Sequence, residues 1–272
     1  MGGAAKIAVC LFFSFSFTSI VLSQDIYFVT FVKGEIKRAN SANIKVGDKL
    51  AFQEKVIFSK KDGRLILLHP QKGRFVVEPG HGQPEPSGEY LIYLKNNLVP
   101  SNEKVKLSTR GDADLDEFFT VNTSISRSLL FIGESRVSLD NTKYRINDAG
   151  NDFFFLQYTP VSGKSSNNRL TVKNDSLRIS NTDFLFNGRE PTDSEEVKIG
   201  FIQNYSKEKK VTKISSFRPR FMGRDECKNI MKAIKASLGN NKEKVIAEAM
   251  TQLYYNFGKP DKNILNAIYD EL

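Results

Sequence analysis

The chain has 272 residues, and its 40 lysines and arginines against 31 aspartates and glutamates give a formal net charge of +9. This length allows one large domain or two modest ones, and 40% hydrophobic residues can supply an apolar core. The positive charge favours anionic partners, while the two cysteines exclude a disulfide-rich scaffold.

The first residues have the layout of a secretory signal peptide. Lys6 precedes the apolar run Ile7–Leu22, and the small residue Ser23 stands before Gln24. A membrane-spanning helix needs ~20 consecutive apolar residues, and this run is shorter and interrupted by serines and a threonine. We therefore expect residues 1–23 to be cleaved between Ser23 and Gln24, with an uncleaved anchor as the alternative.

Cleavage has consequences for charge and redox chemistry. The removed segment carries one lysine and no acid, so the net charge of the mature chain falls from +9 to +8. It also removes Cys10 and leaves Cys227 alone, so no internal disulfide can form. Export to the periplasm or the exterior directs the positive charge toward wall polymers, lipid headgroups or acidic glycans rather than nucleic acid. No stable membrane anchor is expected.

Residues 24–79 contain short β-type runs separated by turn residues. The expected strands are Ile26–Lys33, Asn43–Val46, Lys55–Ser59, Arg64–His69 and Arg74–Glu78. Asp62-Gly63, between two apolar runs, is a hairpin signal. This spacing predicts a small antiparallel β-barrel or sandwich over residues 24–79.

A stretch rich in proline and glycine, Pro79–Gly88, predicts a linker over residues 80–119. Within this linker, Glu89–Val99 fits either a helix or a strand, and Asp112–Phe119 predicts a short helix with acids at its N-terminus. Seven runs then predict a β-sandwich over residues 120–222. They are Leu129–Gly133, Arg136–Asp140, Asp152–Thr159, Arg169–Lys173, Asp183–Phe186, Val197–Gln203 and Val211–Phe217.

After Gly223 the apolar residues recur at helical spacing, which predicts three packed helices over residues 223–272. The first carries Ile230 and Ile234 and stops at Gly239. The second ends at Gly258, and Pro260 is expected to open the third. The fold class is therefore mainly β with an α-helical C-terminus.

Part of this sequence resembles a known type of domain. Val32-Lys33-Gly34-Glu35-Ile36, the run Ile44–Leu50, Val56-Ile57-Phe58 and Arg64–Leu68 are similar to the strand pattern of FecR-type domains, within residues 26–78. Those are β-domains of bacterial periplasmic signalling proteins. FecR-type sensors are expected to carry a cytoplasmic segment and a membrane helix before this domain. This chain is expected to begin with a removable signal peptide instead, so a transmembrane signalling role is not carried over.

The whole mature chain also resembles an uncharacterised family of exported Bacteroidetes proteins. The residues that carry this resemblance are Lys72–Val76, Leu107–Arg110, Leu115–Phe119 and Phe257-Gly258-Lys259-Pro260. The resemblance implies a place in the cell envelope and brings no catalytic residues.

The catalytic and metal-binding motifs are incomplete. His69 and His81, the only histidines, lie at a strand end and in a Pro/Gly loop, and lack zinc-site spacing. The acids from Asp112 to Glu117 lack the glycine of a calcium loop, and Gly163-Lys164-Ser165 lacks the earlier glycine of a phosphate loop. We predict no catalytic, cofactor or metal residues and no cofactor.

Two features are candidates for function. Arg224, Lys228 and a helix start lie near Cys227 and would favour a reactive thiol, but we expect Cys227 to be a small packing residue. A basic cluster in two turns, which we expect to meet at one end of the small β-domain, is the candidate polyanion site, and ordinary solvated turns are its alternative. Its residues are Lys60, Lys61, Arg64, Lys72 and Arg74, with similar clusters at Lys207–Lys213 and Arg218–Arg224.

These features predict an exported, non-catalytic envelope protein that binds an anionic envelope polymer or another envelope protein. Two alternatives stay open: an envelope hydrolase with a nonstandard site, and a periplasmic regulatory partner of a membrane sensor.

Overall fold

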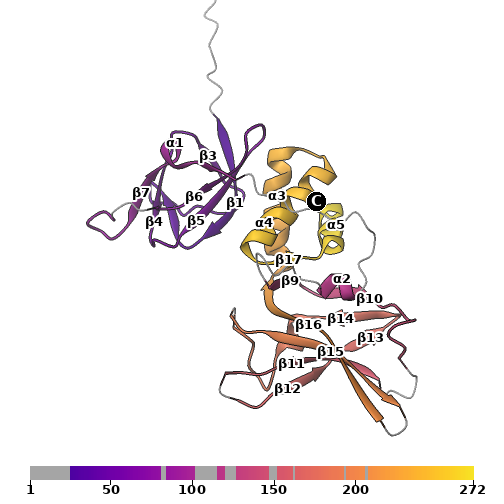
Figure 1. The fold of residues 1–272 in the computed structure, drawn as a ribbon. Coiled ribbons are helices and arrows are strands. Elements are labelled where there is room, and N and C mark those ends of the chain that lie inside the picture. Colours follow the sequence, from indigo (N-terminus) through magenta and orange to yellow (C-terminus); the bar gives the residue numbers. More distant parts are fainter. Residues whose placement is uncertain are drawn as a thin grey trace, which may run out of the picture.

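The structure is a computed structural model that describes residues 25–80, 84–101, 115–119, 127–146, 152–161, 163–192, 194–205 and 208–272 (Figure 1). The predicted signal peptide, its cleavage site at Ser23 and Gln24, and His81 lie outside these residues. The described chain is mainly β with a helical C-terminus, as the sequence predicts. We refer to residues 25–101 as the first β part, 127–222 as the second β part and 223–272 as the helical part.

The first β part consists of two antiparallel sheets around one apolar core. The larger sheet has the order β3-β1-β5-β6-β8, with β1 (Ile26–Lys33), β3 (Lys49–Ala51), β5 (Arg64–His69), β6 (Gly73–Val77) and β8 (Val99–Pro100). The smaller sheet has the order β2-β4-β7, with β2 (Ile36–Arg38), β4 (Lys55–Phe58) and β7 (Tyr90–Tyr93). Over the described residues neither sheet closes on itself, so this part is not a closed barrel.

Three local predictions differ from this arrangement. The turn at Asp62-Gly63 joins β4 to β5, which lie in different sheets, so it is no hairpin. Asn43–Val46 forms no strand, and Asn43 makes only an isolated bridge with Lys37. Within the predicted linker, β7 pairs with β4 and β8 pairs with β6, with the helical turn α1 (Leu94–Asn97) between them. Pairing with distant strands therefore determines the structure of residues 89–99, whose sequence fits either a helix or a strand.

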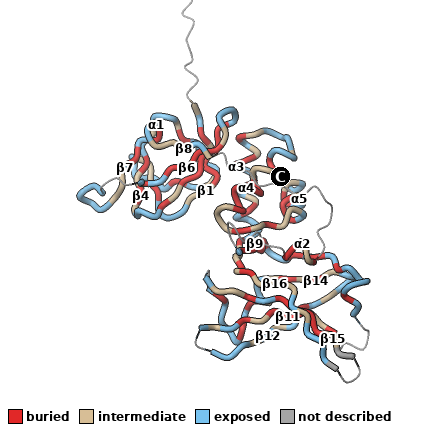
Figure 2. Tube along the Cα trace, in the orientation of Figure 1, coloured by how far each residue is buried: buried red, intermediate tan, exposed pale blue. Residues whose placement is uncertain are grey.

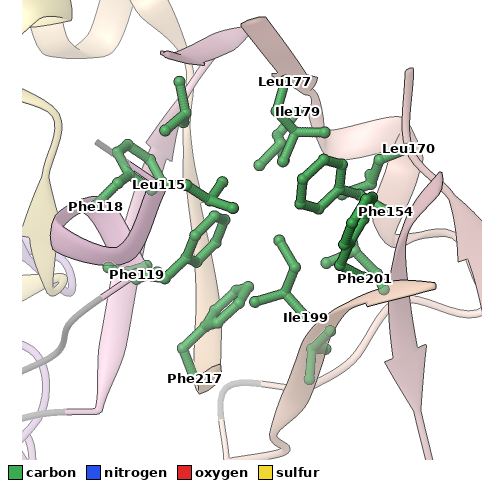
Figure 3. Packing of buried hydrophobic residues seen from close by; sticks show 14 of the residues in the cluster. Leu115, Phe118, Phe119, Phe154, Leu170, Leu177, Ile179, Ile199, Phe201 and Phe217 are labelled. Atoms are coloured by element: carbon green, nitrogen blue, oxygen red, sulfur yellow. The ribbon is translucent and has the colours of Figure 1, made fainter. Parts of the chain in front are cut away.

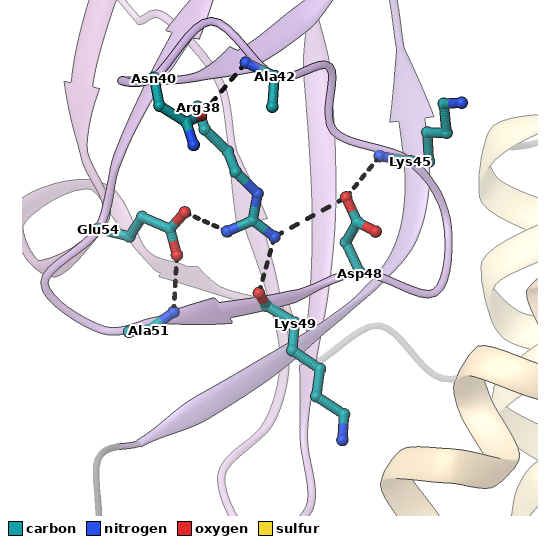
Figure 4. A network of polar contacts seen from close by, with 8 residues as sticks. All are labelled: Arg38, Asn40, Ala42, Lys45, Asp48, Lys49, Ala51 and Glu54. Atoms are coloured by element: carbon teal, nitrogen blue, oxygen red, sulfur yellow. Dashed lines mark hydrogen bonds and ion pairs between the residues drawn. The ribbon is translucent and has the colours of Figure 1, made fainter.

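One arginine ties the loop before β3 to the end of β2 (Figure 4). The guanidinium of Arg38 forms an ion pair with Glu54 and donates a hydrogen bond of 2.9 Å from Nη2 to the carbonyl oxygen of Lys49. Its Nη2 also lies 3.8 Å from Asp48 Oδ2. These contacts use the planar fork of arginine to fix the backbone, so this network is structural.

The second β part has a mixed six-stranded sheet and a three-stranded sheet. The first has the order β12-β11-β15-β16-β9-β17, with β9 (Ser128–Ile132), β11 (Phe153–Tyr158), β12 (Ser166–Arg169), β15 (Val197–Tyr205), β16 (Glu208–Met222) and β17 (Lys259–Pro260). The second has the order β10-β14-β13, with β10 (Ser135–Ser138), β13 (Thr171–Lys173) and β14 (Ser176–Ile179). Residues of both sheets pack into a common core, so the arrangement is sandwich-like.

The core of the second β part is rich in aromatic rings, several of which Figure 3 shows. The short helix α2 (Leu115–Phe119) inserts Leu115 and Phe119 into this core, where both are almost fully buried. The ring of Phe119 lies 5.2 Å from that of Phe217 on β16. Ser215 Oγ donates a hydrogen bond of 2.9 Å to the carbonyl oxygen of Phe119, which satisfies a backbone group at the helix end.

One predicted strand of this part is wrong. Asp183–Phe186 was expected to be extended, but Asn181–Phe184 forms the 3₁₀ helix η1. The cause is local, because the Asp183 carboxylate accepts a hydrogen bond of 2.7 Å from the backbone N–H of Ser180 and caps the turn. The predicted strand Arg169–Lys173 is divided between β12 and β13.

The helical part contains α3 (Arg224–Leu238), α4 (Lys242–Asn256) and α5 (Lys262–Asp270). Gly239 ends α3 with a φ of 76°, as the sequence predicts. Pro260 does not open α5. It lies in β17, and Asp261 caps α5 by accepting a hydrogen bond of 2.8 Å from the N–H of Asn263.

The helices lie between the two β parts (Figure 1). Their buried face packs against Leu68 of β5 on one side and against Leu130 and Ile132 of β9 on the other. Figure 2 shows buried chain along α3, α4 and β9, where these contacts are made. Ser237 of α3 also donates a hydrogen bond of 3.4 Å to the carbonyl oxygen of Leu68. The chain after α4 returns to the second β part, where β17 pairs with β9 in parallel.

Candidate anion-binding groove

The five predicted polyanion-binding residues do not form one cluster. Lys60 and Lys61 precede β5, whereas Lys72 follows it in the turn to β6. Turns that flank one strand lie at its opposite ends, and the six residues of β5 place them roughly 17 Å apart. The expectation that both turns meet at one end of the β part is therefore wrong.

The Lys72 end is occupied by a local polar network. Lys72 forms an ion pair with Asp25, and its hydrogen bond is the main cause that lowers the pKa of the Asp25 carboxyl. Asp25 Oδ1 also lies 3.5 Å from Nε2 of the buried His69. His69 Nδ1 accepts hydrogen bonds of 3.1 Å from the N–H groups of Gln71 and Lys72. His69 therefore caps the β5–β6 turn, and its acceptor nitrogen is already used.

Arg74 is buried, and its Nε lies 3.2 Å from Oε1 of Glu248 on α4. The Arg74 side chain is 6% exposed and that of Glu248 is 18% exposed, so solvent screens this pair little. Arg74 therefore joins β6 to the helical part instead of facing solvent.

Replacing Glu248 with glutamine keeps the shape of the side chain but removes the charge that balances Arg74. Because the buried cation then loses the negative charge of Glu248 beside it, we expect the free energy of unfolding to fall by about 2 kcal/mol. The control is Asp270→Asn, which breaks the exposed pair with Lys242 and should cost less than about 1 kcal/mol. Urea denaturation of both variants measures the difference. If both variants lose equally little stability, Glu248 does not stabilise the buried Arg74 side chain.

Two of the remaining three residues of the predicted cluster line a groove of about 460 Å³. Lys61 and Arg64 meet Lys33 from the end of β1 and Arg220 from β16 there. We call this the basic groove. Tyr255 and Asn256 of α4 line it as well, so the groove lies where the two β parts meet the helical part. Lys60 is exposed beside it but does not line it.

The charges in the basic groove are only partly balanced. Lys33 Nζ lies 3.2 Å from Asp62 Oδ2, and Arg64 Nε lies 3.2 Å from Glu78 Oε1. Lys61 forms no ion pair with another described residue. Burial lowers the pKa of Arg220, which shows that its guanidinium is partly withdrawn from water. Among the described residues that line the groove there are four cations and two carboxylates, so the net charge of its lining is positive and attracts an anion.

Part of this groove could be predicted from the sequence. Lys61 and Arg64 were predicted, and Arg220 lies in the predicted cluster Arg218–Arg224. Lys33 was missed, because only its pairing with Arg64 across β1 and β5 brings the two together. In the cluster Lys207–Lys213, Lys209, Lys210 and Lys213 are exposed on β16, away from the groove.

Cys227 belongs to the apolar core of the helical part. Its side chain is fully buried in the helical core, and this burial raises the pKa of the thiol to about 12, although nearby Arg224 opposes the shift. The packing role of Cys227 is therefore favoured over a reactive thiol.

We expect Cys227 in the native chain to react with a thiol-specific dye roughly a hundredfold more slowly than in the urea-denatured chain, because the thiolate is scarce and inaccessible. The rate of dye release at pH 8 measures this ratio. Prompt labelling of the native chain would contradict it.

Within the described residues, no three His, Cys, Asp or Glu side chains gather as metal ligands would. Of the acids weighed for a calcium loop, Asp112 and Asp114 lie outside the described residues, and Asp116 forms an ion pair with Lys143. Gly163, Lys164 and Ser165 lie in an exposed turn. None of the described helices is long and apolar enough to span a membrane.

Comparisons with protein-family models, with curated proteins and with solved structures found no match.

Proposed function

We propose that the chain is an exported, non-catalytic binding module of the cell envelope that holds an anionic envelope polymer in the basic groove. The two β parts serve as sandwich-type scaffolds in this proposal, the first of the FecR type. The observation that carries the proposal is the convergence of Lys33, Lys61, Arg64 and Arg220 in one groove of about 460 Å³. Grooves of this size enclose small ligands, and arginine matches carboxylate and phosphate geometry.

Lys61 offers the sharpest test, because its neighbour Lys60 is a matched control. Both are exposed lysines in one turn, but only Lys61 lines the groove. Reversing the charge of Lys61 should weaken binding to anionic wall polymer by roughly tenfold, which corresponds to about 1.4 kcal/mol of lost attraction. Lys60→Glu changes the net charge of the chain equally and should weaken binding by no more than about twofold.

The experiment passes the purified chain over wall-polymer and anionic-lipid fractions at rising salt. Salt-sensitive retention of the wild-type chain and of Lys60→Glu on wall polymer, with early elution of Lys61→Glu, supports the proposal. If the chain is retained only on the lipid fraction, its ligand is an anionic lipid, and the assignment to a wall polymer is wrong. If nothing is retained, or if both variants elute together, the groove does not bind the polymer.

A further inference from the structure

A second pocket adjoins the basic groove. It has a volume of about 490 Å³ and is lined by Asn96, Asn97, Val99 and Pro100. Arg64 and Glu78 line both cavities, so their ion pair forms the boundary between the two. We call the second cavity the amide pocket. Its residues come from the end of α1 and from β8, at the edge of the larger sheet.

The amide pocket differs in chemistry from the basic groove. Asn97 donates a hydrogen bond of 2.9 Å from Nδ2 to the carbonyl oxygen of Tyr93, which fixes its amide. The exposed amide of Asn96 makes no hydrogen bond to another described residue. Val99, 63% exposed, adds an apolar surface beside these amides. Amides can both donate to and accept from hydroxyl groups, and an apolar surface can cover the face of a neutral ring.

The boundary pair limits which polyanions fit. A chain with a charge on every repeating unit, such as polyphosphate or a nucleic acid, would place an anion against Glu78 and the neutral amides. Among the described residues that line the amide pocket, Arg64 is the only cation, and it already pairs with Glu78. Burying an anion there without a free cation is costly. A ligand that alternates charged and neutral units avoids this cost.

We propose that the two cavities together bind an acidic glycan, with a carboxylate-bearing sugar in the basic groove and a neighbouring uncharged sugar in the amide pocket. This inference rests on the proposed function and names its ligand class. Each cavity lies within the volume range of small-ligand pockets, so the pair extends beyond what a single inorganic anion fills.

The test compares two soluble probes by titration calorimetry. One is an oligosaccharide of alternating uronate and N-acetylhexosamine, and the other is linear polyphosphate with the same number of charges. We expect the glycan to bind at least fivefold more tightly. Asn96→Ala should weaken glycan binding about three- to fivefold, since it removes one hydrogen-bonding amide, and leave polyphosphate binding unchanged. Gln53→Ala removes an exposed amide outside both cavities and is the control.

The outcomes separate this inference from the proposed function. If polyphosphate binds as tightly as the glycan, or if Asn96→Ala has no more effect on glycan binding than Gln53→Ala, the glycan assignment is wrong. A large effect of Lys61→Glu on binding of both probes would then still support an anion-binding groove. If neither probe binds, the glycan assignment is wrong. If Lys60→Glu and Lys61→Glu also elute identically from the wall polymer, the proposed function is wrong as well.

Discussion

Replacing Gly258 with alanine is expected to lower the free energy of unfolding by about 4 kcal/mol. Gly258 follows α4 with a φ of +124°, and a Cβ atom there would lie 2.6 Å from the carbonyl oxygen of Ser128 on β9. The added atom meets backbone, which cannot rotate away. The cost combines an overpacking term of about 1–3 kcal/mol with a backbone-strain term of about 1–3 kcal/mol.

Two other glycines separate these terms. Gly239 also has a positive φ, but nothing lies within 4 Å of its added Cβ, so Gly239→Ala measures the strain alone and should cost about 1 kcal/mol. Gly223 has a φ of −64° and open space, so Gly223→Ala should change stability by less than about 1 kcal/mol. Urea denaturation of the three variants gives the comparison. A Gly258→Ala loss no larger than that of Gly239→Ala would mean that β9 does not contact this turn in solution.

Removing the ring of Phe119 should cost about 3–5 kcal/mol, the usual range for a buried phenylalanine. Phe119 is 0% exposed, and its ring contacts those of Phe118 and Phe217. The five residues of α2 are too few for an independently stable helix, so its position depends on this anchor. We therefore expect Phe119→Ala to release α2 as well as to leave a cavity.

Phe52→Ala is the matched control, because Phe52 is 36% exposed and should cost about 1 kcal/mol or less. Thermal denaturation reports the stability of both variants, and proteolysis detects release of α2, since a freed segment is cleaved before the core unfolds. Equal stability losses for the two variants, with α2 still protected, would contradict the role of Phe119.

Elements specified by local pattern could be predicted from the sequence. The spacing of Ile230 and Ile234 identifies α3, and Gly239 marks its end, because helical periodicity and the positive-φ cap are both local properties. The strands β1, β5 and β6 were recognised from their β-branched and aromatic runs. The 3₁₀ helix η1 was missed because a side-chain cap at Asp183 outweighs the strand propensity of its neighbours.

Non-local pairing could not be read in the same way. The Asp62-Gly63 turn predicts a reversal of the chain but not that the next strand enters another sheet. The residues of the basic groove show the same difference between local and non-local features. Lys61 and Arg64 are close in sequence and were predicted together, whereas Lys33 and Arg220 join them only through strand pairing and through the contacts of α4.

The position of β9 sets an order for folding. Its two parallel partners, β16 and β17, come about 90 and about 130 residues later in the chain. Loop closure over such separations is slow, because chain entropy is lost before the strand contacts form. During synthesis, one edge of β9 therefore stays unpaired until β16 has emerged, and the other edge stays unpaired until β17 has emerged about 40 residues later. The C-terminal helices, which deliver β17, thus complete a sheet that began in the middle of the sequence.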